Sequence, residues 1–100
     1  MDQPFVSRTF AMGAHEVVCR FQRPIRGDED CRCDYQIVFP ARKRAFRAFG
    51  IDEVQALLLA MQMAHAYLLV SDEYKNQGLT WLGMRDLGLP LAGGLTTPPT

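Results

Sequence analysis

Three cysteines and one histidine are the residues of this chain whose types are most suited to binding a metal ion. Cys19, Cys31 and Cys33 fall on one face of two expected strands, and His15 shares that face with Cys19. Three thiolates and an imidazole are a ligand set of structural zinc, but zinc knuckles usually place two to four residues between the cysteines. Along a strand, C-x-C separates the two Cβ atoms by roughly 6–7 Å. Because cysteine is also a common buried residue, we expect core packing, with no metal and no cofactor.

Few residues are suited to acid–base or nucleophilic catalysis. The two histidines, His15 and His65, are expected at the start of a strand and on the polar side of a helix, without a group that would orient a base. Neighbouring carboxylates occur at residues 28–30, 52–53 and 72–73, which we assign to a loop, a helix start and a helix end. None of these settings combines burial with a facing partner. The sequence identifies no catalytic residue and favours a protein that is not an enzyme.

Three arginines are expected on the outer face of the sheet, where they form a basic stripe. They are Arg20, Arg32 and Arg47. An RNA-binding sheet interleaves such arginines with exposed aromatic rings, which stack on bases. Here the aromatic residues alternate onto the opposite, inner face: Phe21, Tyr35, Phe39 and Phe46. Glu16 and Asp34 share the outer face and can pair with the arginines. The pattern favours a solvated, salt-linked surface, and weak nucleic-acid binding is the less favoured alternative.

Composition describes one small globular domain without a strong charge preference. The chain has 100 residues, 48% of them hydrophobic, with 11 basic and 11 acidic side chains. A net charge of zero argues against a general polyanion binder. We expect residues 1–91 to form a single α+β domain and residues 92–100 to form a flexible C-terminal tail. The beginning of the chain has no secretory pattern and no apolar run is long enough for a membrane span, so we expect a cytoplasmic location.

Four segments alternate between apolar and polar residues, or are rich in β-formers, and predict strands. They are residues 5–12, 15–22, 31–39 and 45–49. Short connections between consecutive strands predict a four-stranded antiparallel meander with one apolar face. That face needs a cover. The single long helix expected over residues 52–76 is the element available, and a short extended segment follows it.

The expected helix is apolar on more than one side. Asp52 is a suitable N-cap, and Gln55 three residues later completes a capping-box pattern. A broad apolar stripe is assigned to the sheet: Ala56, Leu57, Ala60, Met61, Ala64, Tyr67 and Leu68. The opposite side should be polar, but most of its residues are aliphatic, and Gln62 and His65 are the polar exceptions. The candidate interface residues are Leu58, Leu59, Gln62, His65, Leu69, Val70 and Trp81.

Two covers are possible for this second apolar side of the helix. The segment after the helix, which contains Trp81, Leu82, Leu87 and Leu89, can fold back over it. Alternatively, a second copy of the chain can cover it, because large exposed apolar patches mark interaction sites. Fully burying four aliphatic side chains contributes on the order of 6–12 kcal/mol before association costs. Both covers stay open, and a homodimer is the expected state if the second applies.

Three blocks resemble an uncharacterised family of short bacterial proteins. They are GIDEVQALLLAMQMAHAYL (50–68), GLTWLG (78–83) and DLGLP (86–90), with looser similarity at residues 8–10 and 33–39. The resemblance covers most of residues 8–90. It implies a bacterial, cytosolic setting and this domain extent, and it supplies no catalytic residues. It also suggests a shared task for Gln55 and Trp81, namely docking the segment after the helix onto the helix.

The leading functional hypothesis is a non-enzymatic protein-interaction module that acts as a homodimer, with another protein as a further possible partner. The alternative is a small-molecule-binding or catalytic domain with a cleft near Trp81. Gln55, Trp81, Arg85 and Asp86 are the candidate residues of that cleft. The third hypothesis is weak nucleic-acid binding through the arginines of the outer face.

Overall fold

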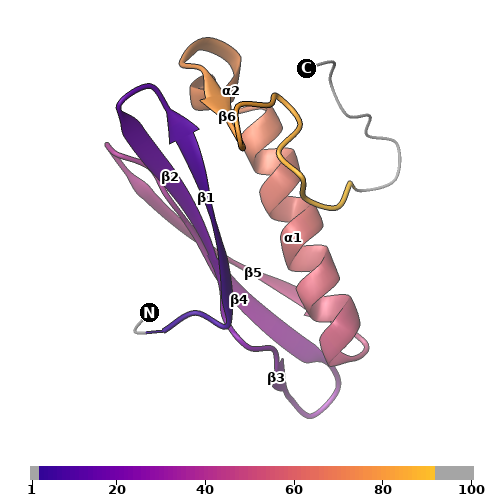
Figure 1. The fold of residues 1–100 in the computed structure, drawn as a ribbon. Coiled ribbons are helices and arrows are strands. Elements are labelled where there is room, and N and C mark those ends of the chain that lie inside the picture. Colours follow the sequence, from indigo (N-terminus) through magenta and orange to yellow (C-terminus); the bar gives the residue numbers. More distant parts are fainter. Residues whose placement is uncertain (1–2, 92–100) are drawn as a thin grey trace.

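The computed structural model describes residues 3–91 and has an α+β fold, with one antiparallel sheet and one long helix on its inner face (Figure 1). The elements in chain order are β1 (Val6–Met12), β2 (His15–Phe21), β3 (Ile25–Arg26), β4 (Cys31–Val38), β5 (Lys43–Gly50), α1 (Glu53–Leu69), α2 (Asp72–Asn76) and β6 (Leu79–Thr80). The predicted class is confirmed. The tail expected over residues 92–100 lies outside the described residues.

The sheet has six strands, so the expected count of four is wrong. The four expected strands are present as β1, β2, β4 and β5 in the spatial order of a meander, and β6 extends the sheet beside β1. The two additional strands, β3 and β6, have two residues each, which is too short to show alternation. β5 begins at Lys43 rather than Ala45, because charged residues at an exposed strand end resemble a turn in the sequence.

β2 and β3 follow the same edge of β4, with a bulge between them. Phe21 is paired with Tyr35, whereas Ile25 is paired with Arg32, so three residues of one strand lie opposite two of the other. Pro24 lies in this interruption, where its missing N–H removes no ladder hydrogen bond. Ile25 and Arg26 lie in the connection between the strands expected over residues 15–22 and 31–39, so their pairing with β4 was not predicted.

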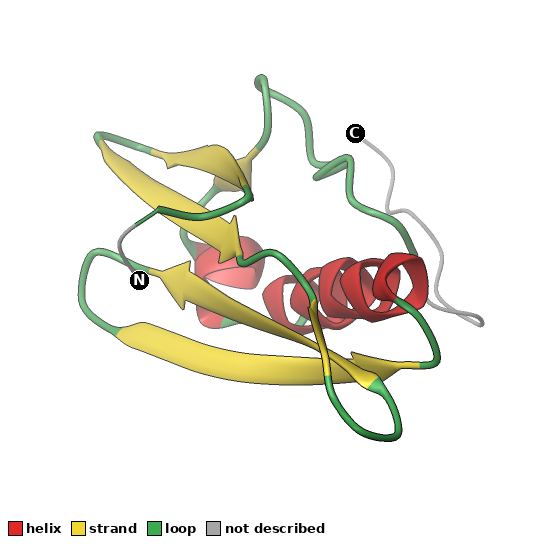
Figure 2. Ribbon diagram, turned by 90° about the horizontal axis from the view of Figure 1, so that it is seen from below, coloured by secondary structure: helices red, strands yellow, loops and turns green. Residues whose placement is uncertain are grey.

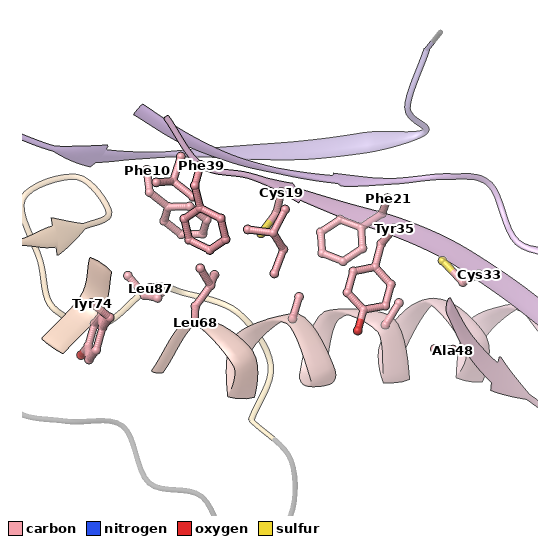
Figure 3. Packing of buried hydrophobic residues seen from close by; sticks show 14 of the residues in the cluster. Phe10, Cys19, Phe21, Cys33, Tyr35, Phe39, Ala48, Leu68, Tyr74 and Leu87 are labelled. Atoms are coloured by element: carbon pink, nitrogen blue, oxygen red, sulfur yellow. The ribbon is translucent and has the colours of Figure 1, made fainter. Parts of the chain in front are cut away.

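Alternate residues of the strands fill the space between the sheet and α1 (Figure 3). Cys19, Phe21 and Tyr35 are among the buried side chains, and the predicted inward face of β2 and β4 is confirmed. The ring centroids of Phe21 and Tyr35 are 5.8 Å apart, and those of Tyr35 and Phe46 are 5.3 Å apart. These offset aromatic contacts connect β2, β4 and β5 beneath the helix.

α1 lies close to the sheet because the residues that face it are small. Ala56, Ala60, Ala64 and Leu68 are fully buried at a spacing of four residues, and the other expected sheet-facing residues pack at the flanks. At the start of the helix, Gly50 of β5 lies against the helix backbone. A Cβ atom at Gly50 would be 2.5 Å from the amide nitrogen of Ala56.

The helix expected over residues 52–76 is two helices. Asp52 is the N-cap of α1, as predicted, and its Oδ1 accepts a hydrogen bond from the Gln55 amide at 2.8 Å. α1 ends at Leu69, and Ser71 is the N-cap of α2. The Ser71 hydroxyl donates to the Leu68 carbonyl at 2.7 Å and accepts from the Tyr74 amide at 3.2 Å. A serine that caps a new helix competes with continued helical hydrogen bonding at this point.

The chain after β6 forms a strap, residues 84–91, that runs back along α1 on the side of β1 (Figures 1 and 2). Leu87 of the strap is fully buried and belongs to the core. No helix of the described part is long and apolar enough to cross a membrane.

Candidate functional site

The strap covers one part of the second apolar side of α1. His65 is 1% exposed, and its Nδ1 lies 3.1 Å from the Pro90 carbonyl oxygen. Gln62 donates from Nε2 to the Leu91 carbonyl oxygen at 3.3 Å. The sequence placed His65 on a polar, accessible side, and this position is wrong because strap backbone packs over it. Of the candidate interface residues, Leu59, Leu69 and Trp81 are also partly buried against the core.

Two candidate interface residues stay exposed on different sides of α1. Leu58 is 42% exposed and Val70 is 67% exposed. Because successive residues turn about 100° around a helix, Leu58 lies on the side that the strap follows, whereas Val70 lies toward the opposite flank. The predicted interface set is thus divided by the structure into a part under the strap and two separate exposed parts.

Leu58 belongs to an aliphatic stripe at the beginning of α1. Val54 is 75% exposed and lies one helical turn before Leu58 on the same side of α1, and Ile51, which precedes the N-cap Asp52, is 79% exposed next to the helix start. We call these three residues the amino-terminal stripe. A shallow cavity of about 180 Å³ adjoins it, lined by Phe5, Arg23, Pro24, Glu53, Val54 and Leu57. Sequence reasoning missed Ile51 and Val54 because they lie at the helix start, although their spacing was visible.

A second exposed apolar region lies between α1 and the outer strand β5. We call it the edge groove. It has a volume of about 470 Å³ and is lined by Tyr35, Phe46, Met63, Ala66, Tyr67 and Val70. Met63 is 46% exposed. Arg42 and Arg44 both donate from Nη1 to the Tyr67 hydroxyl, at 2.8 and 3.3 Å. The groove is therefore lined by apolar side chains, with the guanidinium groups of Arg42 and Arg44 beside it.

Arg42 joins the connection before β5 to α2 through a carboxylate. Its Nη2 lies 2.9 Å from Glu73 Oε1, and its Nε lies 3.3 Å from Oε2. Glu73 is buried, and this hydrogen bonding raises the pKa of Arg42 above its ordinary value. The sequence regarded the carboxylates at 72–73 as lacking a facing partner, and for Glu73 this is wrong. The bidentate pair fixes the position of α2 relative to the sheet.

Trp81 is enclosed by parts of the protein itself. The Arg8 guanidinium carbon lies 3.9 Å from the Trp81 ring centroid, and Arg8 Nη1 donates to the carbonyls of Leu87 and Gly88 at 3.2 and 2.8 Å. A Cβ atom at Gly88 would overlap the indole ring. Trp81 therefore docks the strap, with Arg8 as its partner. Gln55 takes no part, because its Oε1 accepts from the Ile51 amide at the other end of α1.

The four candidate cleft residues do not converge on a common space. Arg85 stacks on Tyr74 at 3.8 Å, and its Nη1 donates to the Leu79 carbonyl at 3.2 Å. Asp86 Oδ1 accepts from the Gly88 amide at 2.9 Å. A cavity of about 200 Å³ lies nearby between the strap and β1. Its lining residues are Val6, Ser7, Arg8, Phe21, Met61, Gly88, Leu89 and Pro90. Ligand pockets usually measure about 300–1,000 Å³.

The three cysteines are free thiols in the core. Cys19, Cys31 and Cys33 are fully buried. Burial raises the pKa of Cys19 to about 12, and burial together with the Asp34 carboxylate raises the pKa of Cys33 to about 11. Burial also raises the pKa of Tyr35 to about 12, with smaller contributions from Cys19 and Cys33. Thiols with such pKa values are poor nucleophiles. Within residues 3–91, no three His, Cys, Asp or Glu side chains are grouped so as to hold a metal ion.

Asp34 lies among the arginines of the outer sheet face. Its Oδ1 is 3.1 Å from Arg32 Nε and 3.9 Å from Arg47 Nε. Phe49, which is paired with Arg32, is exposed on the same face, and the sequence reasoning had not placed an aromatic ring there. Arg20 lies two strands from Arg47, with β4 between them. The face combines three arginines, one shared carboxylate and one exposed ring.

Comparison with protein families gives a match over most of the chain. The model of a domain of unknown function, DUF6968, matches residues 6–91. The chain belongs to this family. No curated protein and no solved structure matches the chain.

The DUF6968 domain includes every element from β1 to the strap. The amino-terminal stripe and the edge groove are therefore surfaces of the family domain itself. The family description assigns no activity, so any functional conclusion depends on the surfaces described above.

Proposed function

We propose that this DUF6968 protein is a non-enzymatic protein-interaction module that forms a homodimer through the amino-terminal stripe. One observation carries the proposal. Val54 and Leu58 on one side of α1, and Ile51 just before the helix, stay exposed after the strap has packed on α1. Large contiguous exposed apolar patches mark interaction sites, whereas single exposed apolar residues are ordinary on a protein surface. Three free buried thiols suit a reducing compartment, so the proposal includes a cytoplasmic location.

The stripe is suited to pairing with its own copy. In a two-fold interface the same patch is used twice, so each residue must meet a compatible residue of the partner. The stripe is aliphatic along its length and has no charged residue within it. Glu53 and Arg23 flank it, and neither makes an ion pair among the described residues. Across a two-fold axis, Glu53 of one copy can meet Arg23 of the other.

The expected strength follows from the exposed area. Together the three side chains expose about two complete aliphatic side chains, which corresponds to roughly 3–6 kcal/mol per copy on burial. Both copies contribute roughly 6–12 kcal/mol, and association costs at least about 4 kcal/mol. The difference of about 2–8 kcal/mol corresponds to a dissociation constant between about 30 mM and about 1 µM, with a middle value near roughly 0.2 mM. At that middle value the fraction of dimer should rise measurably as the protein concentration increases from about 1 µM to about 1 mM.

Sedimentation equilibrium over that concentration range tests the proposal. The unmodified chain should approach twice the mass of 11.3 kDa, and Val54→Glu should remain a monomer with an unchanged circular dichroism spectrum. Leu82→Glu is the matched control, because Leu82 is equally exposed but lies beyond β6. A strict monomer at about 1 mM, or equal loss of the dimer in both variants, would refute the homodimer.

The other two hypotheses have less support. Small-molecule binding now depends on the cavity of about 200 Å³ beside the strap, because Arg8 and Gly88 enclose Trp81. Nucleic-acid binding depends on the outer face, where Asp34 offsets part of the charge of Arg32 and Arg47. Neither region offers an observation comparable to the exposed stripe.

A further inference from the structure

One edge of the sheet is long and unpaired. β5 is paired with β4 over all eight of its residues, and no described strand lies on its other side. Alternate residues of an outer strand direct their N–H and C=O groups away from the sheet, where they are available to another chain. The opposite border of the sheet offers less open edge. There the last strand, β6, has only two residues, and the strap is bound beside β1 through hydrogen bonds from Arg8 to its carbonyls. β5 is thus the longest open edge.

The edge groove runs beside this open strand. Phe46 points from β5 into the inner layer, and Met63, Tyr67 and Val70 approach from α1. A strand added to β5 would continue the pleat, so every second side chain would project over this apolar groove. The groove and the edge therefore form one continuous surface that accommodates an extended segment with an aliphatic residue at alternate positions.

The charges along this edge have a single sign. Arg42, Lys43, Arg44 and Arg47 lie between residues 41 and 51, and that stretch contains no Asp or Glu. Glu73 neutralises Arg42, and Asp34 lies 3.9 Å from Arg47. Lys43 and Arg44 have no carboxylate within ion-pair distance in the described structure. The edge consequently presents an excess of positive charge to whatever pairs with it.

We propose that β5 accepts an extended segment of another protein as an added strand, and that this segment alternates aliphatic residues with Asp or Glu. The aliphatic side chains lie over the edge groove, and the carboxylates meet Lys43 and Arg47 on the outer face. Backbone hydrogen bonds supply affinity, while alternate side chains supply specificity, as in other cases of β-strand addition. The surface is separate from the amino-terminal stripe, so this proposal does not depend on the homodimer.

A second copy of the chain fits the β5 edge poorly. Two β5 strands can pair antiparallel about a two-fold axis, so that the inner faces of both sheets lie on the same side. The axis can pass through the residue pair at Phe46 or the pair at Arg47. The first register places Arg47 diagonally opposite its own copy, and the second places it directly opposite. Like charges in such positions are destabilising. An acidic strand instead converts each of these contacts into an attraction, which is why the charges favour a different chain as the occupant.

The test uses three fluorescein-labelled nonapeptides and measures fluorescence anisotropy. The first alternates glutamate and valine, the second has the same composition in scrambled order, and the third repeats the first with alternate backbone nitrogens methylated. We expect the alternating peptide to bind and the other two to bind at least about tenfold more weakly. Methylation removes the N–H donors that a strand needs, whereas scrambling keeps charge but loses the match to the pleat.

Protein variants locate the binding site. Lys43→Glu turns a favourable cross-strand charge pair into a like-charge pair, which corresponds to about a tenfold loss of affinity. Arg26→Glu makes the same charge change on β3, on the other side of β4, and should change affinity less than about twofold. Binding of the alternating peptide should also slow amide hydrogen exchange in β5 and leave the exchange of β1 unchanged.

Three results would overturn the proposal. No binding up to about 1 mM peptide would mean that the cations only guard the edge against pairing. Equal binding of alternating and scrambled peptides, with equal effects of both charge variants, would mean non-specific attraction. A peptide-free dimer that Lys43→Glu dissociates would show that a second copy occupies the edge. A dimer that Val54→Glu dissociates would instead have its contact at the amino-terminal stripe. The outcomes of the two proposals can therefore be distinguished.

Discussion

Gly50→Ala tests whether close contact between α1 and β5 holds the fold together. An added Cβ atom would lie 2.5 Å from the Ala56 nitrogen, 2.8 Å from the Gln55 carbonyl carbon and 2.9 Å from the Ala56 Cα. All three neighbours are backbone atoms of the first helical turn, so no side chain can rotate away. The helix itself must move, and with it the buried contacts of Ala56 and Ala60 on the sheet.

The expected loss follows from these distances. Overpacking of a close contact usually destabilises a protein by about 1–3 kcal/mol, and a contact that only backbone can relieve belongs at the upper end. Replacing glycine by alanine also restricts the unfolded chain, which offsets about 0.4–1 kcal/mol. We therefore expect a net loss of roughly 2–3 kcal/mol. For a domain of this size that corresponds to a decrease of about 8–24 °C in Tm.

Urea unfolding followed by circular dichroism and by fluorescence of the single tryptophan measures this loss. Gly27→Ala is the control, since its Cβ would meet one atom, the Asp30 carbonyl oxygen, at 3.2 Å. We expect the control to lose less than about 1 kcal/mol. If Gly50→Ala is no more destabilising than Gly27→Ala, the close approach of α1 to β5 does not determine the stability of the fold.

Three further predictions concern α2, the strap and the core. Glu73→Gln should destabilise the fold by about 1–3 kcal/mol in urea unfolding, because Arg42 loses its charged partner. The same substitution in an Arg42→Met background should cost less, and an equal loss in both backgrounds would contradict the pair. Gly88→Ala, at φ 72°, should release the strap and shift Trp81 fluorescence to the red, and an unchanged spectrum would argue against strap docking. The pKa of Cys19 is raised from 9.0 to about 12, so the folded state retains a proton that the unfolded state loses. The contribution of this thiol to the free energy of unfolding is fully present below pH 9, and about 4 kcal/mol should be lost by pH 12. The loss between these pH values should be smaller in Cys19→Val.

Much of the sheet could be predicted because its alternation is local. Strand β4 has Cys31, Cys33 and Tyr35 on one face, and the period of two places them in the core irrespective of neighbouring strands. The N-cap at Asp52 was likewise visible, because a capping side chain binds an amide three residues away. Features whose physical cause lies within a few residues were accessible from the sequence.

The missed features depend on distant partners. Glu73 is buried because Arg42, 31 residues earlier, binds its carboxylate. His65 is buried because strap backbone near Pro90 covers it, and strap position in turn depends on the contact between Arg8 and Trp81. The candidate interface was divided for the same reason. Helical periodicity indicated an excess of apolar residues, but the path of the strap decides which of them remain exposed.

Cross-linking at the stripe tests the central proposal most directly. Leu58→Cys places one accessible thiol at the proposed two-fold contact, whereas the three natural cysteines are buried. With a short bis-maleimide at about 100 µM protein, we expect a covalent dimer for Leu58→Cys and a monomer for Leu82→Cys. Equal cross-linking of both variants, or a monomer for both, would contradict the proposal that two copies meet at Ile51, Val54 and Leu58.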